Sequence, residues 1–111
     1  MSYNLSPMRR LRRVSHHKNT KREPGVYLLY KRKDGPVRYV GRSDTNLKRR
    51  LKNRMYARYH FQNTKSETEA YLLECILWHK YQSTIDNSKY NGGNHPAKPY
   101  NMYLSCPICR K

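Results

Sequence analysis

The hydrophobic and polar residues of the chain first form a regular pattern at residues 25–31 (GVYLLYK). Residues 36–41 (PVRYVG) are similarly rich in strand formers, and residues 33–35 (KDG) between the two segments are typical of a turn. We therefore predict a β-hairpin. Alternation along its first strand places Tyr27 and Leu29 on one face of the sheet. It places Val26, Leu28 and Tyr30 on the opposite face. Since both faces are partly apolar, helices are expected to cover the sheet.

A first helix is predicted directly after the hairpin. Ser43 or Asp44 can serve as its N-cap, and the helix is expected to run to about Met55. Its buried side is defined by three residues at helical spacing, Leu47, Leu51 and Met55. Residues 58–62 (RYHFQ) follow this helix, and they suit either a third short strand or the end of a longer helix.

A second helix is predicted from a capping box at residues 66–69 (SETE) to about Tyr81. Residues 85–100 are rich in Asn, Gly, Ser and Pro, and we expect them to be a loop that leads to a tail containing cysteines. The pattern as a whole predicts one small α+β domain at residues 24–111. Its expected architecture is a three-stranded antiparallel sheet flanked by helices.

The chain is strongly basic, with 24 Lys and Arg residues against 7 Asp and Glu residues and a formal net charge of +17. Solubility does not require so much charge, so a polyanion is the expected partner. The alternative is a solvated surface, or a basic protein that binds acidic surfaces without specificity. Residues 1–23 lack apolar periodicity, and we expect a flexible basic arm that orders on nucleic acid, or else a solubilising tail.

The expected location is intracellular and cytoplasmic, without membrane binding. No stretch of the sequence reaches the roughly 20 apolar residues that a membrane-spanning helix needs. The first residues (MSYNL) also lack the apolar block of a secretory signal. The chain has three cysteines, Cys75, Cys106 and Cys109. This odd number favours reduced thiols or metal ligands over disulfides.

Candidate chemistry comes from four groups of residues in a particular order. GVY at 25–27 precedes YVG at 39–41, LKRRL at 47–51 follows, and Glu74 lies within the apolar run of the second helix. This order resembles the GIY-YIG nucleases over about residues 24–80. The resemblance implies a GIY-YIG-like fold and an endonuclease that hydrolyses the phosphodiester bonds of nucleic acid, with DNA favoured over RNA.

The residue types themselves suit this chemistry. Hydrolysis of a phosphodiester needs an activated water, a cation to receive charge on the phosphate, and stabilisation of the leaving oxygen. Glu74 is a hard oxygen ligand for Mg²⁺ or Mn²⁺, and Arg50 offers a planar donor fork for the phosphate. Tyr27 and Tyr39 can orient or deprotonate water.

Each of these residues also has a plainer explanation. Tyr27 and Tyr39 would pack as half-buried strand tyrosines, and Arg50 would be one more charge on a basic helix. Glu74 falls on the margin of the buried stripe of its helix, where it would pair with a nearby arginine. The joint arrangement favours the catalytic interpretation.

The resemblance assigns a role to each matching residue. It implies that Tyr27 is the general base or the residue that positions it, and that Tyr39 is a supporting phenol. It implies phosphate binding by Arg50 and coordination of a single divalent metal, Mg²⁺ or Mn²⁺, by Glu74. The residues expected to contact nucleic acid are glycines that allow close backbone approach and nearby basic residues, namely Gly25, Gly41, Arg42, Lys48, Arg54, Arg9, Arg10, Arg12 and Arg13.

Two family positions are matched less directly. The family commonly has an Asn beyond the acid, and we assign it to Asn101 on its local sequence, with Asn87, Asn91 and Asn94 as competitors. The family often places a His or Tyr one turn after the arginine, but Arg54 stands there in this chain. Tyr56 or His60 would then have to replace it.

A second metal, of a different kind, is predicted from the cysteines. The spacing Cys106-x-x-Cys109 is that of half a zinc site. Cys75 and His79 are four residues apart on the second helix and would point to the same side, so they could complete a structural zinc site that ties the tail to the helix. His95 could replace His79. In the alternative, Cys75 is a core thiol.

The sequence thus predicts a metal-dependent endonuclease with a structural zinc. The competing hypothesis is a non-catalytic nucleic-acid-binding module with a zinc-stabilised tail, whose basic surface grips phosphates.

Overall fold

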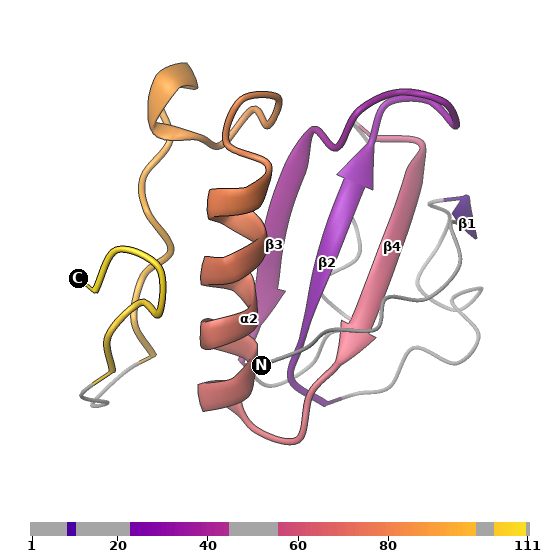
Figure 1. Ribbon diagram of the computed structural model, residues 1–111. Coiled ribbons are helices and arrows are strands. Elements are labelled where there is room, and N and C mark those ends of the chain that lie inside the picture. Colours follow the sequence, from indigo (N-terminus) through magenta and orange to yellow (C-terminus); the bar gives the residue numbers. More distant parts are fainter. Residues whose placement is uncertain (1–8, 11–22, 45–55, 100–103, 111) are drawn as a thin grey trace.

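The computed structural model describes residues 9–10, 23–44, 56–99 and 104–110. Its main feature is an antiparallel sheet in which β2 (Gly25–Tyr30) lies between β3 (Tyr39–Ser43) and β4 (Arg58–Asn63) (Figure 1). The two-residue strand β1 (Arg9–Arg10) pairs with the outer side of β4, so the order is β1-β4-β2-β3. β3 therefore forms one edge of the sheet.

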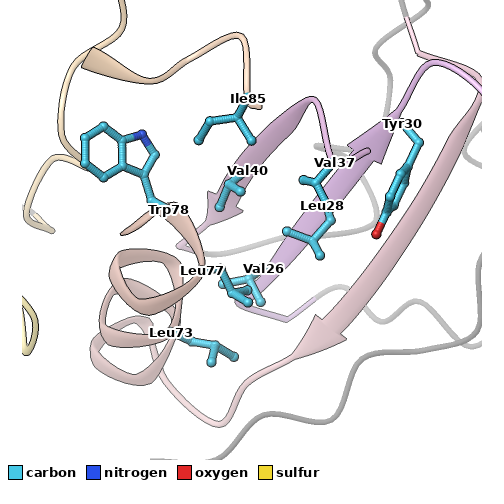
Figure 2. Packing of buried hydrophobic residues seen from close by; sticks show 9 residues of the cluster. All are labelled: Val26, Leu28, Tyr30, Val37, Val40, Leu73, Leu77, Trp78 and Ile85. Carbon is cyan, nitrogen blue, oxygen red and sulfur yellow. The ribbon is translucent and has the colours of Figure 1, made fainter. Parts of the chain in front are cut away.

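Among the described residues, one long helix, α2 (Glu67–Lys80), covers one face of this sheet (Figure 1). It begins where the capping box predicts, because the Ser66 side chain accepts a hydrogen bond from the backbone N–H of Glu69. The core between the helix and the sheet is apolar and buried (Figure 2). Its residues are Val26, Leu28, Tyr30, Val37, Val40, Leu73, Leu77, Trp78 and Ile85.

The opposite face of the sheet carries a second buried cluster that is mainly aromatic. It consists of Tyr27, Leu29, Tyr56, Tyr59 and Phe61. The predicted alternation along residues 25–31 is thus confirmed, since Val26, Leu28 and Tyr30 face α2 and Tyr27 and Leu29 face away from it. Aromatic residues suit this face because they combine a large apolar surface with polar tips.

The hairpin and the third strand agree with the sequence prediction, but β3 begins at Tyr39, three residues after the predicted start. Pro36 has no N–H to donate to a ladder. The carbonyls of Val37 and Arg38 accept hydrogen bonds from the Thr84 hydroxyl and the Asp86 N–H, at 2.8 and 2.6 Å. The segment after α2 therefore takes over the edge of the sheet before regular pairing starts.

Other expectations differ in extent or fall outside the described residues. The segment expected to be a loop at 85–100 contains a short 3-10 helix, η2 (Lys89–Asn91), which ends at Gly92 with φ of 82°. Of the helix predicted from Ser43 or Asp44 to Met55, only these first two residues are described, and Ser43 ends β3. Most of the predicted arm at 1–23 is not described, although Arg9–Arg10 within it form β1.

Within the described ranges, none of the helices combines the length and the apolar composition needed to cross a membrane.

Two neighbouring leucines of α2 test the position of the core. Leu73 is fully buried in the core against the sheet, whereas Leu72 is partly buried beside the tail. We expect Leu73→Ala to lower the free energy of unfolding by about 2–5 kcal/mol, because it leaves a cavity in the core. Leu72→Ala should lower the free energy of unfolding by less than half of that amount, because Leu72 is only partly buried. Urea unfolding followed by circular dichroism measures both, and equal losses would contradict this packing.

Candidate active site and metal centre

A pocket of about 450 Å³ lies at the β3 edge of the sheet. Its lining comes from β2, β3, α2 and the segment after α2. The lining residues are Tyr27, Tyr39, Val40, Gly41, Arg42, Ser43, Asp44, Glu74, Asn87 and Ala97. Three of the predicted catalytic residues, Tyr27, Tyr39 and Glu74, are therefore brought together although they come from separate elements.

Alternation along β3 explains how residues from both faces of the sheet share one pocket. Val40 belongs to the core under α2, so Arg42, two residues on, also points to that face. Tyr39 packs against the aromatic cluster on the other face, and Gly41 shares that side. Because no further strand pairs with β3 among the described residues, the pocket can wrap around its edge.

Gly41 is required by the position of Tyr27. The two residues are cross-strand partners, and a Cβ atom on Gly41 would lie 2.5 Å from the Tyr27 hydroxyl and ring. The absent side chain lets the Tyr27 hydroxyl reach over β3 to the edge of the sheet. Tyr27 also stacks on Tyr39, with ring centroids 6.2 Å apart and ring planes at 9°. The two phenols thus form a nearly parallel pair at the pocket.

Arg42 connects the two carboxylates of the pocket. Its Nη1 donates to Glu74 Oε1 at 2.6 Å, and its Nε donates to Asp44 Oδ1 at 2.6 Å. The side chains of Arg42 and Glu74 are only 10% and 11% exposed, whereas that of Asp44 is 34% exposed. The guanidinium also lies 5.3 Å from the centre of the Tyr71 ring, which contributes a cation–π interaction.

Burial and pairing act against each other in this ion pair. Burial raises the pKa of Glu74, and the neighbouring Arg42 guanidinium opposes that shift. Burial acts to lower the pKa of Arg42, but the hydrogen bond to Asp44 and the charge of Glu74 raise it overall. The Arg42 guanidinium thus stays charged and supplies the cation that a buried carboxylate at Glu74 needs.

Asn87 fixes the far wall of the pocket to the edge of β3. Its side chain accepts from the Val40 N–H at 3.3 Å and donates to the Val40 carbonyl at 2.7 Å, as a neighbouring strand would. Asn101, the residue assigned to the family Asn from the sequence, lies outside the described residues. Asn87 is one of the competitors for this position, and it lines the pocket.

Several other predicted site residues have different positions. His60 lies on β4 opposite Leu28 and is 3.3 Å from the Tyr30 hydroxyl, so the structure does not bring it into the pocket. Tyr56 packs beside Tyr39 but donates its hydroxyl to Asp86 at 2.8 Å. Gly25 begins β2 opposite Ser43. The remaining predicted residues, Lys48, Arg50, Arg54, Arg12 and Arg13, lie outside the described residues.

Asp44 is the pocket residue that sequence reasoning missed as a site residue. The sequence predicts it only as an N-cap, and its sequence context gives no sign that it shares Arg42 with Glu74.

A second group of potential ligands lies where the tail meets α2. The ligand atoms of His79, His95, Cys106 and Cys109 all lie within 4.8 Å of one another, so this group could hold a metal ion. A tetrahedral zinc with bonds of about 2.0–2.3 Å separates its ligands by roughly 3.3–3.8 Å. The separation of 3.4 Å between Cys109 Sγ and His95 Nε2 falls in this range.

Hydrogen bonds on the outer side of both histidines suit metal binding. His95 Nδ1 lies 3.0 Å from the Pro96 carbonyl, which can only accept, so Nδ1 carries a proton and Nε2 is the ring nitrogen left for a metal. Gln82 Nε2 lies 2.6 Å from His79 Nδ1, and with the side-chain amide turned over its oxygen would accept a proton from Nδ1 instead. His79 Nε2 is then buried without a hydrogen-bond partner among the described residues, as expected of a ligand atom.

The two cysteines of the group lie on a tight turn, in which the Arg110 N–H donates to the Cys106 carbonyl at 2.8 Å. Burial acts to raise the pKa of Cys106, but the Cys109 backbone N–H, the His95 ring and the Ile108 N–H lower it to about 6. Cys106 is therefore suited to be a thiolate, the form that binds zinc.

This group differs from the predicted site in one member, because it contains both histidines and leaves out Cys75. Cys75 is fully buried against Tyr71 and Cys106. Burial raises its pKa to about 12, so the thiol stays neutral. Cys75 and His79 do face the tail together, as their spacing predicts. The sequence could not choose between Cys75 and His95, because the choice depends on the path of residues 85–100.

Comparisons of the chain with family models, curated proteins and solved structures give no match.

Gly41→Ala tests the contact between Gly41 and Tyr27. The added methyl group must displace the Tyr27 ring, so we expect the variant to lose about 1–3 kcal/mol of unfolding free energy. In a Tyr27→Ala background the same change should cost less than about 0.5 kcal/mol, because the obstacle is gone. Urea unfolding of the four proteins completes the cycle. An equal cost in both backgrounds would show that the ring does not lie over Gly41.

If the group of His79, His95, Cys106 and Cys109 binds zinc, the purified protein should contain about one equivalent per chain. Cys109→Ser removes a ligand and should lower the zinc content to well below half an equivalent, whereas Cys75→Ala should leave it unchanged. Elemental analysis of both variants measures this difference. Loss of zinc from Cys75→Ala alone would instead favour the ligand set predicted from the sequence.

Proposed function

We infer that the chain is a divalent-metal-dependent endonuclease of the GIY-YIG type, which hydrolyses phosphodiester bonds of nucleic acid, with DNA favoured over RNA. One observation carries this proposal. Tyr27, Tyr39, Arg42 and Glu74 come from three elements and both faces of the sheet, and they meet in one pocket at its edge. The packing of a small core does not require two phenols, a guanidinium and an acid to converge in this way.

In this proposal the side chains on one face of the sheet activate water, and those on the other face bind the phosphate. The stacked phenols of Tyr27 and Tyr39 orient the attacking water, and Tyr27 is the base or the residue that positions it. Arg42 offers charged donors to a phosphate oxygen from the other side of β3. Arg50, which the resemblance implies as a phosphate ligand, would add to this charge.

Glu74 fits the role of a metal ligand. Its carboxylate is buried, lines the pocket and pairs with the Arg42 guanidinium. A buried carboxylate needs a neighbouring positive charge, and a metal ion could supply that charge as well as an arginine can. A Mg²⁺ or Mn²⁺ ion bound to its oxygen would stabilise charge on the phosphate and on the leaving oxygen. The catalytic ion would be separate from the group formed by His79, His95, Cys106 and Cys109.

The second metal in the proposal is a structural zinc at this His and Cys group. Two of its ligands come from the tail, one from α2, and one, His95, from the segment that also supplies Ala97 to the pocket. Zinc bound there would hold the tail and the pocket wall against α2, which matters in a domain with a small core.

A non-catalytic nucleic-acid-binding module is the second candidate, and the observed pairing of Glu74 with Arg42 favours it. An acid that only neutralises a buried arginine needs no catalytic role. This candidate predicts that the protein retards DNA in a gel and leaves it intact when Mg²⁺ is present.

Cleavage of labelled DNA with Mg²⁺ tests the nuclease proposal. Loss of the metal ligand in Glu74→Gln should lower the cleavage rate by about 100-fold or more. Glu67→Gln is the matched control, because Glu67 lies on the same helix but does not line the pocket. It should cleave as the wild type does. Equal cleavage by wild type and Glu74→Gln, or binding of DNA without any cleavage, would contradict the proposal.

A further inference from the structure

We propose that Arg42 competes with the catalytic metal for Glu74, so that the metal binds tightly only when a nucleic-acid phosphate draws the guanidinium away. This inference rests on the proposed role of Glu74 as a metal ligand. It would make Arg42 a positioning residue that couples metal binding to substrate binding.

The geometry of the ion pair places Arg42 where a metal would have to bind. Arg42 Nη1 lies 2.6 Å from Glu74 Oε1, and the two side chains, only 10% and 11% exposed, both line the pocket. A divalent ion on the same oxygen would adjoin the guanidinium. Two cations cannot share such a buried position favourably, so the ion must displace the guanidinium or bind weakly.

Asp44 gives the guanidinium a second anchor nearer to solvent. Arg42 Nε donates to Asp44 Oδ1 at 2.6 Å, and Nη2 lies 3.4 Å from Asp44 Oδ2. The Asp44 side chain is 34% exposed, against 11% for Glu74. The guanidinium could therefore leave Glu74 and keep its contact with Asp44, with Nη1 turned towards the pocket. Arginine binds phosphate oxygens through such a donor fork.

The charges of the pocket favour joint binding of phosphate and metal. Among the described lining residues, Glu74 and Asp44 are negative and Arg42 is positive, which leaves a net charge of −1. One phosphodiester and one divalent ion together bring this charge to zero. The ion alone would leave +1 and the phosphate alone −2, so each ligand should strengthen the binding of the other.

Mn²⁺ binding to the zinc-loaded protein, measured by the electron paramagnetic resonance of free Mn²⁺, tests the competition without any cleavage. We expect Arg42→Gln to bind Mn²⁺ at least 10-fold more tightly than wild type, and Arg42→Gln/Glu74→Gln to lose this gain. Arg38→Gln is the matched control, because Arg38 pairs with Asp86 at 2.7 Å and does not line the pocket. It should bind Mn²⁺ as wild type does.

The native chain provides a second test that does not depend on the stability of Arg42→Gln. Fluorescence anisotropy measures the binding of a labelled DNA oligonucleotide with Ca²⁺ and without added divalent cation, at constant ionic strength. We expect Ca²⁺ to tighten binding by wild type at least 10-fold, and by Arg42→Gln and Glu74→Gln less than threefold. Equal tightening by wild type and Arg42→Gln would overturn the proposal.

The outcomes separate this proposal from the nuclease proposal. If wild type and Arg42→Gln bind Mn²⁺ equally well and both need Glu74, the competition is overturned while Glu74 stands as a metal ligand. If no variant binds Mn²⁺ through Glu74, the competition and the metal site fall together.

Discussion

The ion pair between Arg42 and Glu74 joins the edge strand of the sheet to the helix that covers it. Both side chains are about nine-tenths buried, and the two residues are 32 positions apart in the chain. Removing one member of such a pair leaves an uncompensated buried charge and costs about 3–5 kcal/mol. The pair therefore fixes how α2 sits on β3, and with it the shape of the pocket that both elements line.

The rest of the pocket follows from the alternation of a strand that lies at an edge. Side chains of β3 point in turn to the α2 face and to the aromatic face, and the open edge lets both groups meet one ligand. Gly41 makes this possible, because its missing side chain leaves room for the Tyr27 hydroxyl. Asn87 closes the edge only as far as Val40, so the strand beyond that point remains part of the pocket.

Local features of the fold could be predicted from the sequence, since alternation specifies β2 and a capping box specifies the start of α2. The side chains that pair with Glu74 could not be predicted from such local patterns. A carboxylate at the margin of a buried stripe needs a cation, but its sequence does not identify Arg42, 32 residues away, as that cation, because this depends on how α2 packs on β3. Asp44, directly after the end of β3, accepts from the same guanidinium, and no local pattern indicates that it does so.

The metal group shows the same limit. The spacing of Cys106 and Cys109 and the shared side of Cys75 and His79 indicate where a metal could bind. The choice of His95 over Cys75 depends on how residues between α2 and the tail travel across the surface, and composition alone does not specify that path. If both metals are bound as proposed, the zinc holds the pocket wall and Glu74 holds the catalytic ion.

The most direct measurement is a crystal structure of the zinc-loaded protein with a DNA oligonucleotide and Ca²⁺ in place of Mg²⁺. The account predicts one phosphodiester at the β3 edge, with the Tyr27 hydroxyl on one side, Arg42 bonded to a phosphate oxygen, and Ca²⁺ on the Glu74 carboxylate. DNA bound along another surface, with Arg42 still paired to Glu74 and the edge of β3 unoccupied, would contradict it.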